Sequence, residues 1–213
     1  MDAAARLFYA EAVEESAVNM LTAEAVIEFE TERLRLRQWR TTDRGPFAAL
    51  NADPEVMAFF PSTLSHEASD ALAARCAALI EARGWGFWAC ELKRTGEFIG
   101  FVGLHEPPAA LPFSPCVEIG WRLALPFWGQ GYASEAARGA LAVGFEQLAL
   151  SEIVSFTATI NTRSRAVMSR LGMRQTGQFM HPLLADGSPL RAHCWYRLPV
   201  AQWHAQGLTR RRK

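Results

Sequence analysis

The sequence predicts a mixed α/β (α+β) fold with a central sheet of about seven strands, antiparallel in its N-terminal half and flanked by helices. Strand-like runs with two-residue alternation and helix-like runs with 3.6-residue periodicity succeed one another along the chain. In the second half a strand, a loop, a helix and a strand follow in that order, which favours parallel pairing of strands four and five. The 213 residues, 50% of them hydrophobic, suffice for one domain with a single core.

The N-terminal half begins with a strand and two helices whose ends are marked by capping residues. Leucine alternates with arginine over residues 33–37, as a half-buried strand requires. Asp43 is placed to cap a short helix that ends before Asp53-Pro54, because proline disfavours helical geometry in the residue before it. Ser65 is placed to cap a longer helix that ends at Gly84, a residue suited to a left-handed cap.

A hairpin and a fourth strand follow these helices. Residues 87–92 and 97–104 are strand-like, and Gly96 suits the tight turn between them. A proline-rich loop over residues 107–115 then leads to residues 116–125, which are rich in β-branched and aromatic residues and predict the fourth strand.

The C-terminal half continues with two helices, each next to a strand. Residues 134–147 carry an apolar stripe at helical spacing, as in a helix that lies on a sheet. A strand at 152–160 and a helix at 161–171 come next, and Gly172 can end that helix in the left-handed conformation. Two further strands are expected at about 174–180 and 190–198.

The chain divides into three parts. Residues 1–28 are acidic and alanine-rich, and we interpret them as an accessory helix or a mobile tail. Residues 29–200 are expected to form one domain. Residues 201–213 are expected to form a basic C-terminal tail. For its four basic residues at 210–213 we expect a frayed, solvated end, with a docking patch as the alternative.

Charge and cysteine content exclude several classes of protein. Lysine plus arginine equals aspartate plus glutamate at 22 each, so no overall field favours nucleic acid or an anionic membrane. The four cysteines lack the spacing of a zinc site, and we expect buried thiols in a reducing compartment and no metal. No apolar run reaches the roughly 20 residues that span a bilayer, and no secretory signal is visible, so we expect a cytoplasmic protein without membrane contact. We further expect a monomer or a homodimer.

A glycine-bearing loop leads into the third predicted helix and is a candidate phosphate-binding site. Its sequence, Trp-Gly-Gln-Gly-Tyr-Ala-Ser over residues 128–134, leaves backbone N–H groups at the positive end of the helix. Gly129 and Gly131 would let a phosphate approach these groups closely. The same residues taken alone fit a plain tight turn equally well.

Motifs on both sides of this loop give it a family context. Residues 118–121 (Glu-Ile-Gly-Trp) precede it, and residues 161–164 (Asn-Thr-Arg-Ser) follow it, succeeded by Leu-Gly-Met at 171–173. Together with the strand at 31–37, these motifs resemble the GNAT N-acetyltransferase superfamily, and within it the RimJ/RimL-like branch that acetylates N-terminal amines of ribosomal proteins. The resemblance covers about residues 31–199.

The resemblance implies a GNAT fold, acetyl-coenzyme A as co-substrate and an amine as acceptor. In the family the loop grips the pyrophosphate, and the preceding strand pairs its backbone with the pantetheine arm, which enters where strands four and five splay apart. Trp128 stands where the family usually has arginine or glutamine, although backbone donors can hold a phosphate without that side chain. The implied coenzyme contacts are Ile119, Gly120, Trp121, Arg122, Leu123, Trp128, Gly129, Gln130, Gly131, Tyr132, Ala133, Ser134, Asn161, Arg163, Ser164 and Arg165.

Two residues are candidates for proton transfer. Glu118 could accept the ammonium proton directly or through water, as the equivalent glutamate does in several relatives; alternatively it is a salt-bridged or exposed strand residue. Many family members protonate the leaving thiolate with a tyrosine, but that position is Met168 here. The hydroxyl of Ser164 could instead hydrogen-bond the sulfur, or it could cap backbone N–H groups.

Other residues are open to two interpretations. Asn161 could bind the pantetheine amides or cap the following helix, and Arg163 and Arg165 could bind phosphates or lie on a solvated helix face. Three histidines, His105, His181 and His193, lie near strand ends and could form an acceptor site, although surface or capped histidines are more frequent.

The predicted function is acetyl transfer to a primary amine, either a protein N-terminus or a small molecule, by direct attack in a ternary complex. A catalytically weak or inactive coenzyme-A-binding sensor or interaction module is the alternative from another class. Use of the loop for ATP is disfavoured, because the Gly-Lys-Ser/Thr ending of a P-loop is absent.

Overall fold

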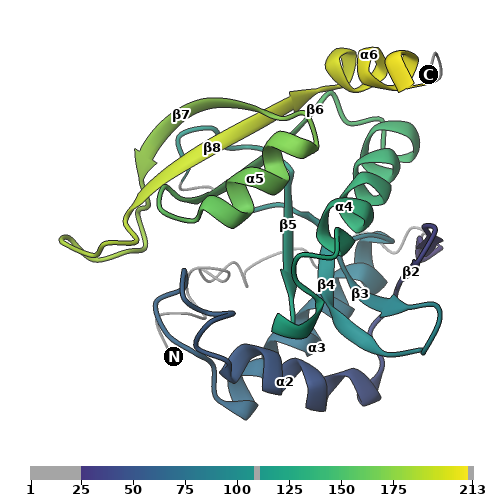
Figure 1. The fold of residues 1–213 in the computed structure, drawn as a ribbon, viewed down its shortest axis with the longest axis vertical. Helices are drawn as coiled ribbons and strands as arrows, with labels where there is room; N and C mark the ends of the chain where they lie inside the picture. Colours follow the sequence, from purple (N-terminus) through teal and green to yellow (C-terminus); the bar gives the residue numbers. More distant parts are fainter. Residues whose placement is uncertain (1–24, 108–110, 211–213) are drawn as a thin grey trace.

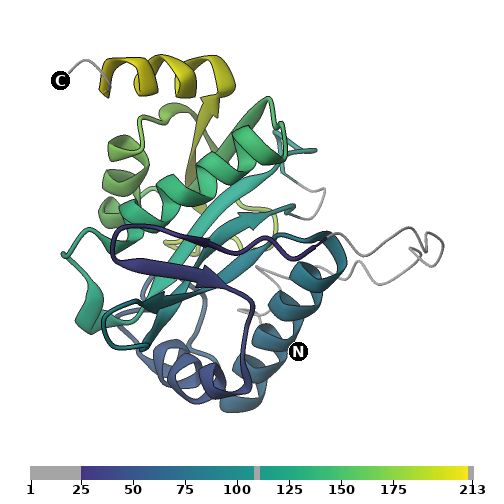
Figure 2. The same ribbon diagram turned by 90° about the vertical axis from the view of Figure 1, so that its right-hand side faces the viewer.

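The computed structural model describes residues 25–107 and 111–210, and these form an eight-stranded sheet with helices on both faces (Figures 1 and 2). The strands are β1 (Phe29–Glu30), β2 (Leu34–Arg37), β3 (Phe87–Leu92), β4 (Phe98–His105), β5 (Glu118–Leu123), β6 (Glu152–Ala158), β7 (Arg174–Met180) and β8 (Ala192–Pro199). The helices are η1 (Thr41–Asp43), α2 (Arg44–Ala52), α3 (His66–Arg83), η2 (Leu125–Phe127), α4 (Tyr132–Ala142), η3 (Val143–Gln147), α5 (Thr162–Arg170) and α6 (Val200–Arg210).

The strand order is β1-β2-β3-β4-β5-β6-β8-β7, and every neighbouring pair is antiparallel except β5 and β6. The predicted mixed sheet with parallel strands four and five is therefore confirmed. The predicted count of about seven strands is one too low, because the short β1 adds an edge strand beside β2. Its two residues carry no alternation that the sequence alone could reveal.

The parallel pair separates soon after it begins. Glu118 and Val154 are the only residues of β5 and β6 in ladder register. The Val154 amide donates to the Val117 carbonyl at 2.9 Å, and the Ser155 hydroxyl donates to the Ile119 carbonyl at 2.8 Å. Beyond these bonds β5 continues to Leu123 without a ladder partner on its β6 side among the described residues. A gap therefore opens between the two strands, and Figure 1 shows them diverging.

The two faces of the sheet carry separate apolar cores. On one face α4 and α5 pack over residues such as Leu36, Leu104 and Ile119. On the other face α2 and α3 pack over Phe87, Ala89 and Phe101. Successive strand side chains point to opposite faces, so the alternation along β5 decides which core each of its residues meets.

Helix ends agree with the sequence at Ser65 and Gly84 and differ from it at Asp43. The Ser65 hydroxyl accepts from the Ala68 amide and so caps α3, which ends at Gly84 with φ of 80°. Asp43 precedes α2, but its side chain makes no cap bond there, and that expectation is wrong. Its carboxylate accepts instead from the buried Arg37 guanidinium at 2.7 and 2.9 Å, because a charged donor makes the stronger hydrogen bond.

The described residues at both ends of the chain pack against the domain. Residues 1–24 of the predicted extension lie outside the described residues, but the Ile27 amide donates to the Gly84 carbonyl, and the Ile27 carbonyl accepts from Trp88. Residues 201–210 of the expected basic tail belong to α6, where Trp203 stacks on Phe145. The last three residues of the basic cluster lie outside the described residues. None of the helices within the described ranges has the length and apolar character needed to cross a membrane.

Candidate active site

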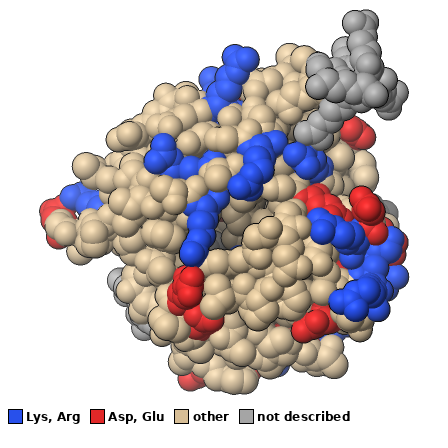
Figure 3. All heavy atoms as spheres, in the orientation of Figure 1, with Lys and Arg blue, Asp and Glu red and all other residues tan. Residues whose placement is uncertain are grey.

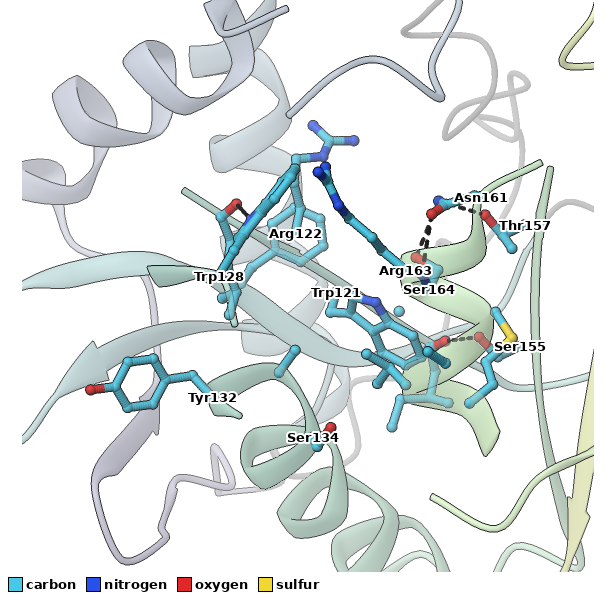
Figure 4. A pocket seen from close by; sticks show the side chains of 18 of the residues that line it. Trp121, Arg122, Trp128, Tyr132, Ser134, Ser155, Thr157, Asn161, Arg163 and Ser164 are labelled. Atoms are coloured by element: carbon cyan, nitrogen blue, oxygen red, sulfur yellow. Dashed lines mark hydrogen bonds between the residues drawn. The ribbon is translucent and has the colours of Figure 1, made fainter. Parts of the chain in front are cut away.

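A cavity of about 1710 Å³ opens where β5 and β6 separate. Its walls come from β5, β6, the loop and first turns of α4, the first turns of α5, and the segment that joins α2 to α3. Pockets for single small ligands usually measure roughly 300–1,000 Å³, so this space can hold more than one substrate. Figure 4 shows the side chains that reach into it from β5, α4 and α5.

The N-terminus of α4 is open at one end of the cavity. Gly131 is its N-cap, with φ of 84° and no side-chain cap, whereas the side chains of Ser65 and Asn161 cap α3 and α5. Gly129 also has positive φ, and a Cβ there would meet nothing within 4 Å. The first N–H groups of α4 can therefore bind an anion. This geometry suits an anion, and the phosphate site that the loop predicts, like the binding of coenzyme A there, stays a prediction.

Arginine side chains surround this helix end. The cavity is lined by Arg33, Arg138, Arg163 and Arg170, and Figure 3 shows basic side chains gathered along one edge of a hollow in the surface. Arg33 binds Glu135 with its Nε at 2.6 Å, donates to the Gln130 carbonyl at 3.1 Å and stacks over Tyr132. It thereby fixes the loop against β2. This role could not be predicted from a local pattern, because Arg33 and Gln130 are 97 residues apart in the sequence.

Trp128, the departure from the family pattern, supports an arginine in the structure. Its Nε1 donates to the Leu123 carbonyl at 2.7 Å, which fixes the ring. The Arg163 guanidinium lies 4.7 Å from the ring centroid and 3.3 Å from a Glu55 carboxylate oxygen. Figure 4 shows the Trp128 and Arg163 side chains next to each other. A positive charge is thus held beside the loop by a neighbouring helix.

Glu118 lies where the two strands begin to part. Its side chain lines the cavity, only 8% of the residue is exposed, and burial raises its pKa from 4.5 to about 8. Its Oε2 has no hydrogen-bond partner among the described residues. The alternative interpretations of a salt-bridged or exposed glutamate are therefore wrong. A carboxyl group that changes charge near neutral pH suits proton transfer.

Asn161 and Ser164 form a small hydrogen-bonded group at the start of α5. The Asn161 Oδ1 accepts from the Ser164 amide at 3.1 Å, so Asn161 caps α5. Its Nδ2 donates to Thr157 Oγ1 at 3.0 Å and to Ser164 Oγ at 3.2 Å (Figure 4). The structure therefore favours the cap over a pantetheine contact for Asn161. The Ser164 hydroxyl accepts within this group and can still donate its own proton into the cavity.

Two of the predicted coenzyme contacts, Gln130 and Arg165, do not line the cavity, whereas all the others do. Arg165 donates to the Thr159 carbonyl at 3.0 Å and to the Tyr196 hydroxyl, away from the lining. Residues two apart on a helix point in different directions, so Arg163 and Arg165 cannot both face one space. The Gln130 side chain donates to the Pro126 carbonyl and stabilises the turn itself.

The remaining candidates divide between lining and core. Met168 is 1% exposed and belongs to the apolar core, although it also borders the cavity. His181 and His193 lie with ring centroids 4.8 Å apart in an aromatic cluster, where burial lowers the pKa of both. His193 and His105 reach the cavity wall, and burial lowers the pKa of His105 to about 4. These histidines are uncharged at neutral pH.

Sequence reasoning missed the wall opposite α4. Phe60, between α2 and α3, and Phe101 on β4 line the cavity together with Arg122, whose guanidinium lies 4.2 and 5.4 Å from the two ring centroids. Arg122 was expected only as part of a strand that pairs with pantetheine. Within the described residues, no group of three or more histidine, cysteine, aspartate or glutamate side chains is placed to hold a metal ion.

Known proteins share this fold and sequence pattern. The sequence profile of the family described as "Acetyltransferase (GNAT) domain" matches residues 33–174. The chain is 32% identical over 171 residues to FsC-acetyl coenzyme A-N(2)-transacetylase of Aspergillus fumigatus, which covers 76% of this chain and 71% of that protein. A GNAT-family acetyltransferase of Bacillus anthracis superposes with a TM-score of 0.70 at 24% identity, covering 82% of this chain and 99% of that one. The ribosomal-protein-S5-alanine acetyltransferase of Vibrio fischeri superposes with a TM-score of 0.66 at 18% identity, over 83% and 98% of the two chains.

Proposed function

Because the chain belongs to the GNAT acetyltransferase family, we propose that it moves an acetyl group from acetyl-coenzyme A to a primary amine by direct attack in a ternary complex. One observation carries the proposal: a single cavity holds both the uncapped N-terminus of α4 and the buried carboxyl group of Glu118. The first can bind the phosphates of the donor, and the second can take a proton from the acceptor.

The donor fits the geometry of the gap. Gly129, Gly131 and the first N–H groups of α4 would hold the pyrophosphate, with Arg163 and Arg33 nearby. The β6-facing backbone of β5 beyond Glu118 would pair with the pantetheine arm in the manner of an added strand. This path leads the thioester towards Glu118.

Glu118 and Ser164 would handle the protons of the reaction. Glu118 accepts a proton from the ammonium group, and the freed amine attacks the thioester carbonyl to form the new C–N bond. Collapse of the tetrahedral intermediate breaks the C–S bond and releases coenzyme A. Ser164 Oγ, which accepts a hydrogen bond from Asn161, would donate a hydrogen bond to the departing sulfur and keep its own proton. A thiol of pKa near 8.5 also leaves tolerably as the thiolate.

Thiol release from acetyl-coenzyme A, measured with a panel of N-terminal peptides and small amines, tests the proposal. Turnover with at least one amine and tight binding of acetyl-coenzyme A in calorimetry are expected, with no comparable binding of ATP. Tight binding without turnover on any amine would favour the sensor or interaction module instead.

A further inference from the structure

Glu118 lies on the face of the sheet opposite α4 and α5, at the border between two differently covered halves. Ile119 and Ile153 belong to the core beneath α4 and α5, so their neighbours Glu118 and Val154, which are in ladder register, point to the other face. On this face α2 and α3 cover the half next to β3 and β4. The half formed by β6, β8 and β7 carries aromatic side chains. An acceptor amine that reaches the Glu118 carboxyl must therefore lie against one of these halves.

On the helix-covered half, Phe87 and His105 pack next to the carboxyl group. A Cβ at Gly120 would lie 3.1 Å from the Phe87 ring, so this ring fills the space in front of Gly120. His105, the cross-strand partner of the glutamate on β4, stacks on the same ring with centroids 5.2 Å apart. The Arg122 guanidinium, which donates to Asn51 Oδ1, starts from an α-carbon about 13 Å farther along β5. A small acceptor bound at the carboxyl group therefore meets β6 and not this half.

Phe156 is the β6 side chain that borders the cavity on this face. It lies two residues beyond Val154 and so points to the same side as Glu118, with its α-carbon at least about 8 Å from that of the glutamate. The ring lines the cavity and is only partly buried. Its neighbours are four aromatic side chains with ring centroids 5.8 to 6.2 Å away, namely Phe113, Phe179, His181 and His193. These side chains hold the ring in place before a substrate binds.

This aromatic wall carries no charge at neutral pH among the described residues. The residues of β6 and β8 that line the cavity are Ser155, Phe156, Thr157 and His193. The His193 Nδ1 lies 3.3 Å from the Arg191 carbonyl, and a carbonyl oxygen only accepts, so this nitrogen carries the proton. Burial lowers the pKa of His193, as it does for His105 and His181, and the imidazoles are uncharged. A charged acceptor group would lose hydration here without gaining an opposite charge.

Building on the proposed function, we infer that the acceptor is a primary amine with an aromatic ring two carbons away from its nitrogen. The ammonium group lies at the Glu118 carboxyl, and the ring packs against Phe156. Because the two side chains stand on one face of neighbouring strands, a spacer of two carbons joins the nitrogen at one to the ring at the other. A free arylalkylamine and a peptide that begins with phenylalanine share this chemistry.

Matched acceptors test the inference without changing the protein. Thiol release by the full-length enzyme is measured with 2-phenylethylamine, 2-cyclohexylethylamine, 3-aminopropanoate, 1,3-diaminopropane and two peptides that begin with phenylalanine or alanine. We expect kcat/KM for 2-phenylethylamine to exceed that for the cyclohexyl amine by about 2- to 10-fold, because only the phenyl ring makes an aromatic pair. It should exceed that for the two charged amines by about 100-fold or more, because their second charge would be desolvated.

The two peptides separate the two sources of this chemistry. The phenylalanine peptide should react faster than the alanine peptide, and its kcat/KM relative to 2-phenylethylamine distinguishes chain termini from free amines. Equal kcat/KM for the phenyl and cyclohexyl amines, faster reaction of a charged amine, or a preference for the alanine peptide would overturn the inference. Absence of thiol release with every amine would instead count against the proposed function itself.

Phe156→Leu then assigns this selectivity to one side chain. The variant keeps an apolar side chain and should lose the preference for the phenyl over the cyclohexyl amine, through KM more than kcat, because Glu118 is unchanged. Phe179→Leu is the matched control, since its ring belongs to the same cluster but does not line the cavity, and it should keep the preference. Calorimetry with acetyl-coenzyme A reports folding, and unchanged affinity is expected in both variants. A preference that survives in Phe156→Leu, or disappears equally in Phe179→Leu, would contradict the assignment to Phe156.

Discussion

The two walls of the cavity differ in where they place their charges. On the α4 side the cations lie at the rim, and the Arg163 and Arg33 side chains are 62% and 43% exposed. On the α2–α3 side the charged groups are inside the wall, where Glu118 and Arg122 are 8% and 4% exposed. Water screens the exposed arginines of the α4 side, whereas it hardly reaches the two buried charged groups of the α2–α3 side.

This difference separates two ways of binding. A phosphate-rich donor can be held by many weak contacts, because backbone N–H groups and several exposed arginines share its charge. The opposite wall has few charged groups, and each of them is desolvated, so each has a large effect on protonation or recognition. Substitutions on the two walls should therefore differ in the size of their effects.

The largest effect is expected for Glu118→Gln, which keeps the shape of the side chain but removes the base. We expect kcat to fall by about 10²- to 10⁴-fold, with the affinity for acetyl-coenzyme A unchanged. In the parent enzyme kcat should rise with pH until Glu118 loses its proton near pH 8, and this limb should be missing in the variant. If the variant keeps both the kcat of the parent and its rise with pH, Glu118 takes no part in the proton transfer.

The same substitution should change stability in a pH-dependent way. The folded protein keeps the Glu118 proton up to about pH 8, whereas the unfolded chain releases it near 4.5. The folded state thus binds more protons within this window, and its free energy of unfolding falls as pH rises through it. Glutamine has no such proton, so Glu118→Gln should be more stable than the parent at pH 9 by a few kcal/mol, at about 1.4 kcal/mol per pKa unit.

Urea unfolding of both proteins at pH 5 and pH 9 measures this difference. The Glu118 charge also raises the pKa of the Cys116 thiol, but burial is the larger cause of that raised pKa, so the comparison reports mainly on residue 118. Identical pH slopes would mean that the Glu118 carboxyl is hydrated in solution.

The walls also differ in how far the sequence predicts them. The loop over residues 128–134 is contiguous, so its glycines and helix start identify the phosphate site without any knowledge of the fold. The opposite wall is assembled from Asn51, Phe60, Phe101 and Arg122, which lie up to 71 residues apart and meet only because α2 and β4 pack on one face. No local pattern could reveal that Asn51 orients Arg122.

Local ambiguity explains the remaining errors. Asn161 precedes a helix and belongs to a family motif, and both a cap and a ligand contact use the same amide, so only the observed bond to the Ser164 amide separates them. Residues 201–213 are expected to form a C-terminal tail, yet Val200 and Trp203 pack on the core at helical spacing. That three-residue spacing was the available signal for α6.

An intermediate effect is expected for Gly131→Ala on the donor wall. Gly131 has φ of 84°, and left-handed geometry costs an L-residue about 1–2 kcal/mol, although a Cβ would find only Arg33 at 3.5 Å. The loop should relax and withdraw its N–H groups, weakening acetyl-coenzyme A binding about tenfold in calorimetry. Gly187→Ala is the control, since it has φ of 82° and open space but lies outside the cavity lining. An equal loss of affinity in both variants would show a general loss of stability.

The smallest effect is expected for Arg163→Gln, because its guanidinium is exposed and shared between Trp128 and Glu55. An exposed ionic contact is worth about 0.2–1 kcal/mol, so the KM for acetyl-coenzyme A should rise only about two- to fivefold. The difference from the parent should shrink as salt is raised, since the Debye length falls from about 10 Å at 0.1 M to about 3 Å at 1 M. Arg44→Gln, at the exposed start of α2, should leave KM unchanged. A large increase in KM that does not change with salt would mean that coenzyme binding buries Arg163. The difference in exposure between the two walls would then exist only in the protein without ligands.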